Sequence, residues 1–494
     1  MSLTIYDTKR REKREFKPLQ EGKVQMYTCG VTPYDYSHIG HARCYVAFDT
    51  VVRHLRYLGY ELTYVRNYTD IDDKIIKRAN ERNMEAVDLA AEFIKAYQED
   101  MAALNVISAD HEPKVSETIP EIIEMVETII KNGKGYEVDG DVYFSIDSMP
   151  DYGKLSGRNL DDLRSGARVG VDERKKNPLD FALWKSAKPG EPSWESPWGL
   201  GRPGWHIECS AMSQKFLGDV FDIHAGGKDL IFPHHENEVA QSEACTKCQH
   251  VNYWMHNGFV NIDNEKMSKS LNNFFTIREV LKVFHPETLR LFLLTTHYRS
   301  PINYSDSNLS DARKRLDYLY ETLRKSLKHL GKSWSDIEAR ATGAYDKASS
   351  GEGLRAEFLA AMNDDFNAPK AIGGLSALFT QLNNLADGKV EGLSEEDAKV
   401  ALEDGLRYIK EFGSVLGLWQ HDPADYLAVP QGVSAGGDSA ERMGKEEIED
   451  LIAQRKEARA NKDYARSDAI RDQLKEAGVE IKDSPEGTTW KYAS

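Results

Sequence analysis

The amino-terminal part of the chain alternates between short apolar runs and longer segments with helical spacing. Residues 24–29 form an apolar run that ends at a glycine, which predicts a buried strand. In residues 41–58 the apolar positions recur every three or four residues, which predicts a helix facing a core. Residues 61–67 predict a second strand, and residues 74–104 predict a long helix. This order predicts a right-handed crossover and a parallel sheet, in which ligands lie at the carboxyl ends of the strands.

The pattern changes further along the chain. Between residues 113 and 220 it breaks into a helix, short strands and turns rich in Gly, Pro and Trp, which indicates an insertion into the sheet domain. From 310 to 418 amphipathic helical segments predict a bundle. A stretch rich in Pro, Gly, Ala and Ser over 421–444 predicts a linker, after which two short helices and a small strand close the chain. Strand and helix signals between the insertion and the bundle lie at 220–224, 233–244 and 251–260.

The composition narrows the class of protein. Of 494 residues, 40% are hydrophobic and 29% are charged, which is typical of a soluble globular protein of several domains. The net charge of −16 argues against general binding of polyanions, although a local basic surface would still serve for a nucleic acid. No apolar run reaches the ~18–20 residues of a membrane helix, and the amino terminus lacks the pattern of a signal or transit peptide. Five scattered cysteines argue against a disulfide framework and favour a reducing cytoplasm.

The segment Ser37-His38-Ile39-Gly40-His41 follows the first predicted strand and opens the first predicted helix. A helix amino terminus presents unpaired N–H groups and a partial positive charge, so it suits a phosphate. Two histidines there can add donors, and Gly40 lets a ligand approach the backbone. The alternative is that His38 and His41 only cap the helix.

A second motif, Lys266-Met267-Ser268-Lys269-Ser270, lies in a loop after the last predicted strand. Two lysines and two hydroxyls within five residues can grip a triphosphate and stabilise charge that develops during phosphoryl or nucleotidyl transfer. Taken alone, such a run is also typical of a solvated loop. Two phosphate-suited loops on one strand-and-helix framework favour a nucleotide site.

These two motifs match the HIGH and KMSKS signatures of class I aminoacyl-tRNA synthetases letter for letter. Four further segments, 27–30, 69–74, 203–210 and 232–238, resemble cysteinyl-tRNA synthetases in particular, and the resemblance extends from Ile5 to Trp490. It implies an α/β fold with a Rossmann-like parallel-sheet catalytic domain, an inserted connective domain, a helical bundle and a small carboxyl-terminal anticodon-binding module. The expected boundaries are 1–112 with 221–309, 113–220, 310–420, a linker over 421–444, and 445–494.

A metal site is predicted from four side chains. His234 and Glu238 are four residues apart on a predicted helix and project from one face, where Cys29 and Cys209 could join them. Thiolate, imidazole and carboxylate together form a zinc set. Spacing alone leaves His235 as eligible as His234, and core thiols beside a helix cap are the alternative. The resemblance selects Cys29, Cys209, His234 and Glu238 as the ligands of one Zn²⁺ that would recognise the substrate thiol.

The resemblance also implies the remaining roles. ATP with Mg²⁺ would bind near the two signatures, with Lys269 stabilising the transition state. Gly30, Thr69, Trp205 and His234 would frame the amino-acid pocket. Catalytic and ATP-binding roles would fall to His38, Gly40, His41, Lys266, Ser268 and Lys269.

The last helices carry many cations with Tyr464 among them, which suits single-stranded RNA but is also found on ordinary mixed-charge helices. By resemblance the candidates for reading the anticodon are Arg459, Tyr464, Asp468 and Asp483. The aromatic residue is often Trp in relatives, and Tyr464 can still stack. The pair Cys245 and Cys248 could hold a second metal or be two free thiols.

The expected activity is therefore that of a cysteine–tRNA ligase, which forms cysteinyl-adenylate from L-cysteine and ATP and transfers the cysteinyl group to the 3′ end of tRNA(Cys). A cytoplasmic monomer is expected from the resemblance. Two alternatives remain: an ATP-dependent cysteine ligase of thiol-cofactor biosynthesis, which would not need residues 450–490, and a non-catalytic paralogue that binds tRNA or zinc.

Overall fold

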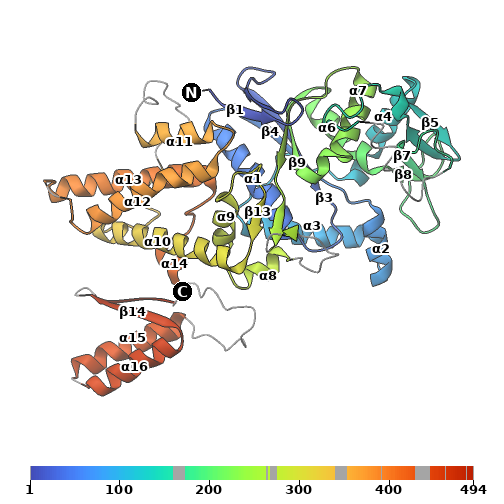
Figure 1. The fold of residues 1–494 in the computed structure, drawn as a ribbon. Helices are drawn as coiled ribbons and strands as arrows, with labels where there is room; N and C mark the ends of the chain where they lie inside the picture. The colour runs from blue at the N-terminus through green and yellow to red at the C-terminus, as the bar shows by residue number, and fades with distance from the viewer. Residues whose placement is uncertain are drawn as a thin grey trace. The chain divides into compact units, whose positions relative to one another are not determined.

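The computed structural model describes residues 2–159, 173–262, 265–266, 275–339, 353–390, 392–428, 445–461, 463–484 and 487–492. The chain divides into two compact units (Figure 1). The first unit holds residues 1–278, 293–304 and 343–372, and the second holds 279–292, 305–342 and 373–494.

A four-stranded parallel sheet organises the first unit, in the order β10-β9-β3-β4. The predicted parallel sheet is confirmed, and its first strand in the chain lies in the middle. Its strands are β3 (Lys23–Val31), β4 (Glu61–Tyr68), β9 (Phe221–Gly227) and β10 (Val251–Asn257).

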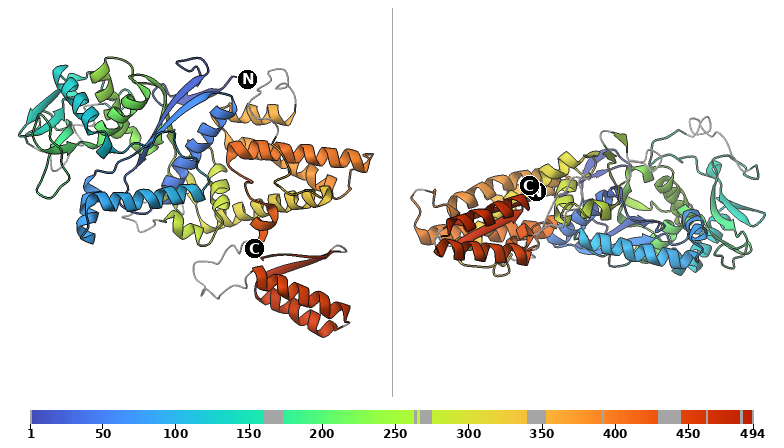
Figure 2. Two further views of the ribbon diagram at one scale, coloured as in Figure 1. Left: turned by 180° about the vertical axis from the view of Figure 1, so that it is seen from behind. Right: turned by 90° about the horizontal axis from the view of Figure 1, so that it is seen from below.

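Helices cover both faces of this sheet, because alternate residues of each strand point to opposite sides. Met26 of β3 packs in one core with Phe48 and Val51 of α1 (Ile39–Tyr57). Tyr27, the next residue, packs in a second core with Ile207 of α6 (Trp205–Leu217) and Val239 of α7 (His234–Thr246). The view from behind shows the sheet between these layers (Figure 2, left). Two further helices, α2 (Asp73–Arg82) and α3 (Ala86–Ala103), follow β4.

The inserted segment carries its own antiparallel sheet, of order β5-β6-β7-β8, beside helix α4. Its last helix, α6, packs on β3 and β4, so the insertion ends against the parallel sheet. The elements are α4 (Ile119–Lys131), β5 (Gly135–Val138), β6 (Asp141–Phe144), β7 (Phe181–Ser186) and β8 (Gly201–Pro203). Other strands of the first unit are β1 (Thr4–Asp7), β2 (Glu12–Glu15), β11 (Val260–Ile262), β12 (Glu265–Lys266) and β13 (Ile302–Tyr304), and its helix α11 spans Leu354–Met362.

The second unit is mainly helical. Tyr320 stacks on Tyr426 with ring centroids 3.8 Å apart, and Phe379 packs on Trp419. Near the carboxyl end two helices and a hairpin share a small core of Ile448, Leu474 and Val479. The helices and strands that lie wholly or partly here are α8 (Ile277–Leu281), α9 (Pro286–Leu294), α10 (Asp306–Leu330), α12 (Ala368–Ala386), α13 (Glu395–Leu416), α14 (Pro423–Ala428), α15 (Lys445–Ala460), α16 (Tyr464–Glu476), β14 (Val479–Ser484) and β15 (Gly487–Tyr492).

Three predicted elements differ in the structure. The helix over 74–104 is broken at Asn83, which adopts a left-handed conformation (φ 52°) and ends α2. The strand over 251–260 is two strands in different sheets, because the backbone at Gly258 turns close against Ser300, whose carbonyl oxygen lies 2.3 Å from where a Cβ would be. The small strand at the carboxyl end is the hairpin β14–β15.

Among the described residues, no helix combines the length and apolar character that a bilayer crossing requires.

Candidate active site

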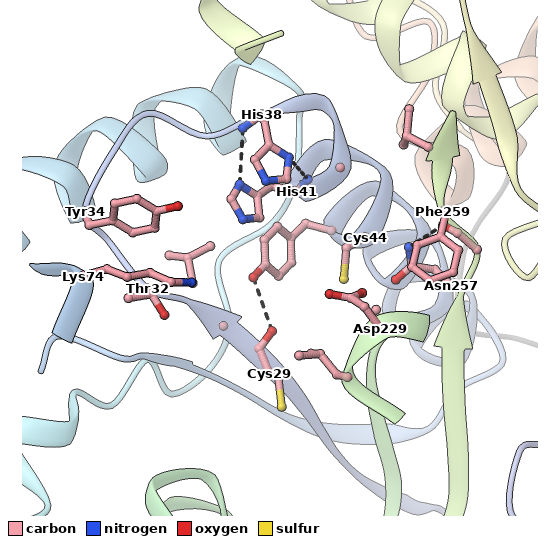
Figure 3. A pocket seen from close by; sticks show the side chains of 18 of the residues that line it. Cys29, Thr32, Tyr34, His38, His41, Cys44, Lys74, Asp229, Asn257 and Phe259 are labelled. Atoms are coloured by element: carbon pink, nitrogen blue, oxygen red, sulfur yellow. Dashed lines mark hydrogen bonds between the residues drawn. The ribbon is translucent and has the colours of Figure 1, made fainter. Parts of the chain in front are cut away.

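A pocket of about 590 Å³ lies at the carboxyl ends of the parallel strands, where ligands bind in such sheets (Figure 3). Cys29 and Gly30 line it from the end of β3, and Asn257 from the end of β10. His38, Gly40 and His41 line it from the start of α1. Strand ends and a helix amino terminus therefore meet at one hollow.

The two histidines of the first motif both cap α1 and line the pocket. His38 is the N-cap residue, and its Nδ1 accepts the backbone N–H of His41 at 3.3 Å. In return the Nδ1 of His41 accepts the backbone N–H of His38, also at 3.3 Å, and the two rings stack 3.8 Å apart. Capping the helix therefore does not prevent His38 and His41 from facing a ligand in the pocket.

Gly30, near the end of β3, lies close against β4. Its backbone N–H donates to Asn67 Oδ1 at 2.8 Å, and a Cβ at this position would lie 1.5 Å from the Asn67 carbonyl oxygen. Asn67 in turn donates to Thr69 Oγ1 at 3.3 Å. Thr69 and Asn67 are buried, and neither is among the residues that line the pocket.

The four predicted metal ligands converge into one cage. The donor atoms of Cys29, Cys209, His234 and Glu238 all lie within 4.8 Å of one another, and all four side chains are buried. The Sγ atoms of the two cysteines are 3.9 Å apart. The Nε2 of His234 lies 3.0 Å from Glu238 Oε1, as expected for residues four apart on α7. The thiols come from the end of β3 and from the first turns of α6.

The electrostatics of the cage suit a cation. Burial raises the pKa of the Glu238 carboxyl and of the Cys29 thiol well above their usual values. A hydrogen bond from Cys29 lowers the pKa of Cys209 to about 7. Glu238 Oε2 accepts no hydrogen bond within the described part of the chain. Two sulfurs, one imidazole nitrogen and one carboxylate oxygen form a donor set that fits a divalent metal, whose charge would favour the ionised thiols and carboxyl.

Aromatic and imidazole rings surround the cage. Trp205 lines the pocket and stacks on His234 with ring centroids 4.3 Å apart. The Nδ1 of His234 lies 2.9 Å from Nδ1 of His206. His224 and His235 also reach the cage, with Nε2 atoms 3.4 and 3.2 Å from Cys29 Sγ. Burial lowers the pKa of both, so both imidazoles are neutral near pH 7.

The second motif begins at the end of β12, where Lys266 pairs with Asn261 of β11. Ser268 and Lys269 lie outside the described residues. The chain that follows is tied to the first motif, because the N–H of Ile39 donates to the Phe275 carbonyl at 3.2 Å and the N–H of Ile277 donates to the Ser37 carbonyl at 2.8 Å. Backbone hydrogen bonds at the start of α1 therefore link the first motif to the chain that follows the second motif.

At the carboxyl end, the four candidate RNA-contacting residues have different surroundings. Tyr464 opens α16 and is 64% exposed. Asp483 accepts two hydrogen bonds from Arg455, at 2.8 and 2.9 Å, and pairs with Arg459 at 2.9 Å. The hydrogen bond from Arg455 holds the pKa of Asp483 well below its usual range. Asp468 pairs with Arg471 on α16 at 3.2 Å. Asp483 thus joins α15 to the hairpin, whereas Tyr464 presents its ring to solvent.

The second cysteine pair carries no sign of a metal. Cys245 is partly buried in the last turn of α7 and Cys248 is exposed. Over the described ranges, the candidate metal-binding groups of Cys, His and acidic residues include neither.

Comparisons with known proteins agree with this geometry. Residues 15–314 match the family model "tRNA synthetases class I (C) catalytic domain", 357–420 match the DALR domain, and 444–490 match the cysteinyl-tRNA ligase anticodon binding domain. A cysteine–tRNA ligase of Trichlorobacter lovleyi is 53% identical over 99% of this chain and 100% of its own length.

The chain belongs to the cysteine–tRNA ligase family.

Another member of the family, the chloroplastic/mitochondrial enzyme of Arabidopsis thaliana, is 50% identical over 99% of this chain and 86% of its own length. Among solved structures, a methionyl-tRNA synthetase of Mycobacterium tuberculosis in complex with methionyl-adenylate superposes with a TM-score of 0.54 at 17% identity. The match covers 80% of this chain and 89% of the other. This likeness shows a shared fold, and the predicted α/β architecture is confirmed.

Proposed function

We propose that this protein is a cysteine–tRNA ligase that activates L-cysteine with ATP and transfers the cysteinyl group to tRNA(Cys). The observation that carries the proposal is the convergence of Cys29, Cys209, His234 and Glu238 beside a pocket that the start of α1 also lines. A group of side chains suited to a metal that binds a thiol thus lies beside a helix terminus that is suited to bind a phosphate. Relatives named cysteine–tRNA ligase, about half identical over nearly the whole chain, support the same activity.

In the first step, the cysteine carboxylate attacks the α-phosphorus of ATP, and pyrophosphate leaves. His38, Gly40 and His41 hold the phosphates at the start of α1, where backbone N–H groups and the helix dipole favour an anion. Mg²⁺ enters as part of the ATP substrate. Lys266, Ser268 and Lys269 stabilise the charge that develops on the phosphates, with Lys269 in the main role. In the second step a hydroxyl of the 3′-terminal ribose of the tRNA attacks the carbonyl carbon of the adenylate, forms an ester with the cysteinyl group, and AMP leaves.

The amino-acid end of the pocket discriminates cysteine from serine. Cys29, Cys209, His234 and Glu238 hold Zn²⁺, and Trp205 forms a wall of the pocket against His234. When bound, the zinc supplies a soft Lewis acid that favours a thiolate strongly over an alcohol, whereas a cavity of fixed shape discriminates poorly between near-isosteres. Gly30 and Thr69 help to position this end of the pocket through Asn67.

The carboxyl-terminal module favours tRNA as the acceptor over a small amine. Residues 444–490 match an anticodon-binding family, and a cysteine ligase of thiol-cofactor biosynthesis would not need them. The intact metal cage argues against a non-catalytic paralogue. Within the module we assign tRNA contacts to Arg459, Tyr464, Asp468 and Asp483. We further propose a monomer in a cytoplasmic compartment, in keeping with five cysteines that form no disulfides.

The test is cysteine-dependent ATP–pyrophosphate exchange on purified protein, with serine as the control substrate, before and after zinc removal. We expect exchange with cysteine alone, its loss with the metal, and its return when zinc is added back. Exchange that survives complete removal of zinc would contradict the proposal that the metal recognises the cysteine thiol. No exchange with metal bound and the fold intact would overturn the ligase assignment.

A single substitution tests the catalytic lysine. Replacing Lys269 with Ala removes a cation that acts mainly in the transition state, so we expect the exchange rate to fall on the order of 10²- to 10³-fold with little change in thermal stability. Lys269→Arg, which keeps the charge, should retain part of the activity. Near-normal exchange by Lys269→Ala would contradict the assigned role.

A further inference from the structure

Six side chains that can bind a metal meet at the cage, rather than four. The donor atoms of Cys29, His224, His235 and Glu238 also lie within 4.8 Å of one another, and all four residues are buried. This second set shares Cys29 and Glu238 with the first and replaces Cys209 and His234 by two other imidazoles. A tetrahedral zinc binds four ligands, so one ion engages one set at a time.

The distances between atoms of the second set are close to those between ligands of a single ion. Cys29 Sγ lies 3.2 Å from His235 Nε2 and 3.4 Å from His224 Nε2. Glu238 completes the set, with Oε2 3.6 Å from His224 and Oε1 3.9 Å from His235. Tetrahedral zinc with bonds of ~2.0–2.3 Å places its ligand atoms roughly 3.3–3.8 Å apart.

His235 is also held in the manner of a ligating histidine. Its Nδ1 lies 2.8 Å from His256 Nε2, and the Nδ1 of His256 lies 2.8 Å from Thr8 Oγ1. If His256 donates to Thr8, its Nε2 accepts the Nδ1–H of His235, and the Nε2 lone pair of His235 points at the cage. A partner on the far ring nitrogen is the usual support of a metal-bound imidazole.

The two sets face different surroundings. His234, in the first set, stacks on Trp205, which is 39% exposed and lines the pocket. His224, in the second set, stacks on Trp254, which is buried, with ring centroids 4.4 Å apart. His235 packs on the same tryptophan at 5.1 Å. Cys29, which both sets share, lines the pocket. The imidazole that belongs only to the first set thus packs on a tryptophan of the pocket wall, and the two imidazoles of the second set pack on a tryptophan of the core.

We propose that Cys29, His224, His235 and Glu238 form an inner metal position, in which the cage retains its zinc while Cys209 and His234 are not engaged. The inference rests on the metal assignment of the proposed function. An ion in the inner position is bound by the imidazoles that pack on the buried Trp254, whereas an ion in the outer position is bound by His234 beside Trp205 of the pocket wall. The inner set therefore stores the metal, and the outer set presents it to the substrate.

The test removes the two ligands that belong only to the outer set. The variant Cys209→Ser/His234→Ala is stripped of metal, reloaded with Co²⁺ and examined by metal analysis and absorption spectroscopy. We expect one equivalent of Co²⁺, with a thiolate-to-metal charge-transfer band about half as intense as in the unsubstituted protein, because one thiolate remains instead of two. Adding His235→Ala should raise the Kd for Co²⁺ at least 100-fold.

A matched control uses a buried imidazole outside both sets. His250 lies beside the cage, with its ring 6.4 Å from that of His224, and His250→Ala in the same double variant should leave Co²⁺ bound. Circular dichroism melts check that each variant folds. If the double variant does not fold, the His235→Ala and His250→Ala changes are compared in Cys209→Ser alone, where His235→Ala should loosen Co²⁺ at least tenfold more.

The outcomes separate the two proposals. Failure of the unsubstituted protein to bind metal would overturn the metal assignment itself. Binding by the unsubstituted protein together with no binding by a folded double variant would overturn the inner position alone. Equal effects of His235→Ala and His250→Ala would do the same.

Discussion

Gly30 shows how tightly the backbone is packed beside the cage. An added Cβ would lie 1.5 Å from the carbonyl oxygen of Asn67, so Gly30→Ala must push β3 away from β4. Overpacking of this kind costs about 1–3 kcal/mol, and here it also displaces the adjoining ligand Cys29. We expect a lower melting temperature and weaker zinc binding, measured by thermal unfolding and metal titration.

A glycine on an exposed helix face is the control for this change. Gly374 of α12 has no atom within 4 Å of its added Cβ. Gly374→Ala should stabilise the protein by about 0.5–1 kcal/mol, because alanine favours the helix. Equal melting temperatures and equal zinc affinities for the two variants would contradict the packing argument.

The residues of the cage could be predicted from the sequence only in part. The four-residue spacing of His234 and Glu238 on a helix indicates a shared face, and motif resemblance selects the two cysteines. The same spacing argument leaves His235 open, and the structure brings it to the cage as well. Asn67 carries no signal of its own in the sequence, because its contact with Gly30 exists only once β3 and β4 are paired.

At the scale of elements, Arg278 fastens the chain that follows the second motif. Its Nε donates to Asp100 at 2.9 Å and its Nη2 to Glu99 at 2.7 Å, and both acceptors lie on α3. The guanidinium also lies 4.9 Å from the centre of the Tyr36 ring, just before the first motif. Arg278 therefore ties the chain that follows the second motif to α3 and to Tyr36, the residue before the first motif.

Arg278→Ala should loosen this attachment and misplace the second motif. We expect the KM for ATP in pyrophosphate exchange to rise about tenfold, because small displacements of positioning groups weaken the reactive geometry. The control is Lys399→Ala, which removes an ion pair with Glu395 on α13, 2.8 Å apart. Identical kinetics for the two variants would count against a positioning role for Arg278.

A buried carboxyl makes the second unit sensitive to pH. Glu287 on α9 accepts the N–H of Trp419 and the hydroxyl of Tyr320, the latter at 2.7 Å, and burial raises its pKa to about 7. The folded form thus holds a proton that the unfolded chain loses near pH 4.5. Stability from this group is complete below pH 4.5, falls as the pH rises to about 7, and stays reduced above it.

The shift corresponds to about 3 kcal/mol between those limits. Glu287→Gln, which cannot ionise, should flatten the dependence and be more stable than the unsubstituted protein at pH 8. Urea unfolding between pH 4.5 and pH 8 measures how the free energy of unfolding of each protein depends on pH. Parallel curves for the two proteins would show that Glu287 does not titrate in this range.

Two boundaries between elements were not predicted from the sequence, and each depends on the backbone at a single residue. The apolar pattern over 74–104 continues across Asn83, and only its left-handed backbone divides the helix. The strand signal over 251–260 likewise continues across Gly258, where close packing against Ser300 turns the chain into another sheet. Periodicity reports which face is buried, and it does not report where a backbone bends.

At the scale of the whole molecule, activation and tRNA recognition should be separable. The carboxyl-terminal helices and hairpin have their own small core, and Tyr464 presents an exposed ring there. Tyr464→Ala should raise the KM for tRNA in aminoacylation by about 10- to 100-fold, the value of one lost base-stacking contact, and leave pyrophosphate exchange unchanged. Tyr464→Phe keeps the ring and should behave normally.

Loss of activity in both assays for Tyr464→Ala would instead indicate that the substitution unfolds the protein. A normal KM for tRNA would remove Tyr464 from the interface. The two assays on one preparation distinguish these cases.

The order of domains follows from composition and pattern over long windows, and so the parallel sheet, the insertion and the helical region could all be predicted. The order of strands within the sheet could not, because no local feature of β3 states that β9, far along the chain, is its second neighbour.

That strand order has a consequence for synthesis. During synthesis β4 follows β3 closely and can pair with it early. The other edge of β3 pairs with β9, which begins roughly 190 residues after β3 ends. At about 5–20 residues per second, a ribosome leaves that edge uncovered for roughly 10–40 s. An unpaired central strand is a template for wrong pairing with other chains. The nascent protein is thus most exposed to aggregation, and most dependent on chaperones, while the insertion emerges.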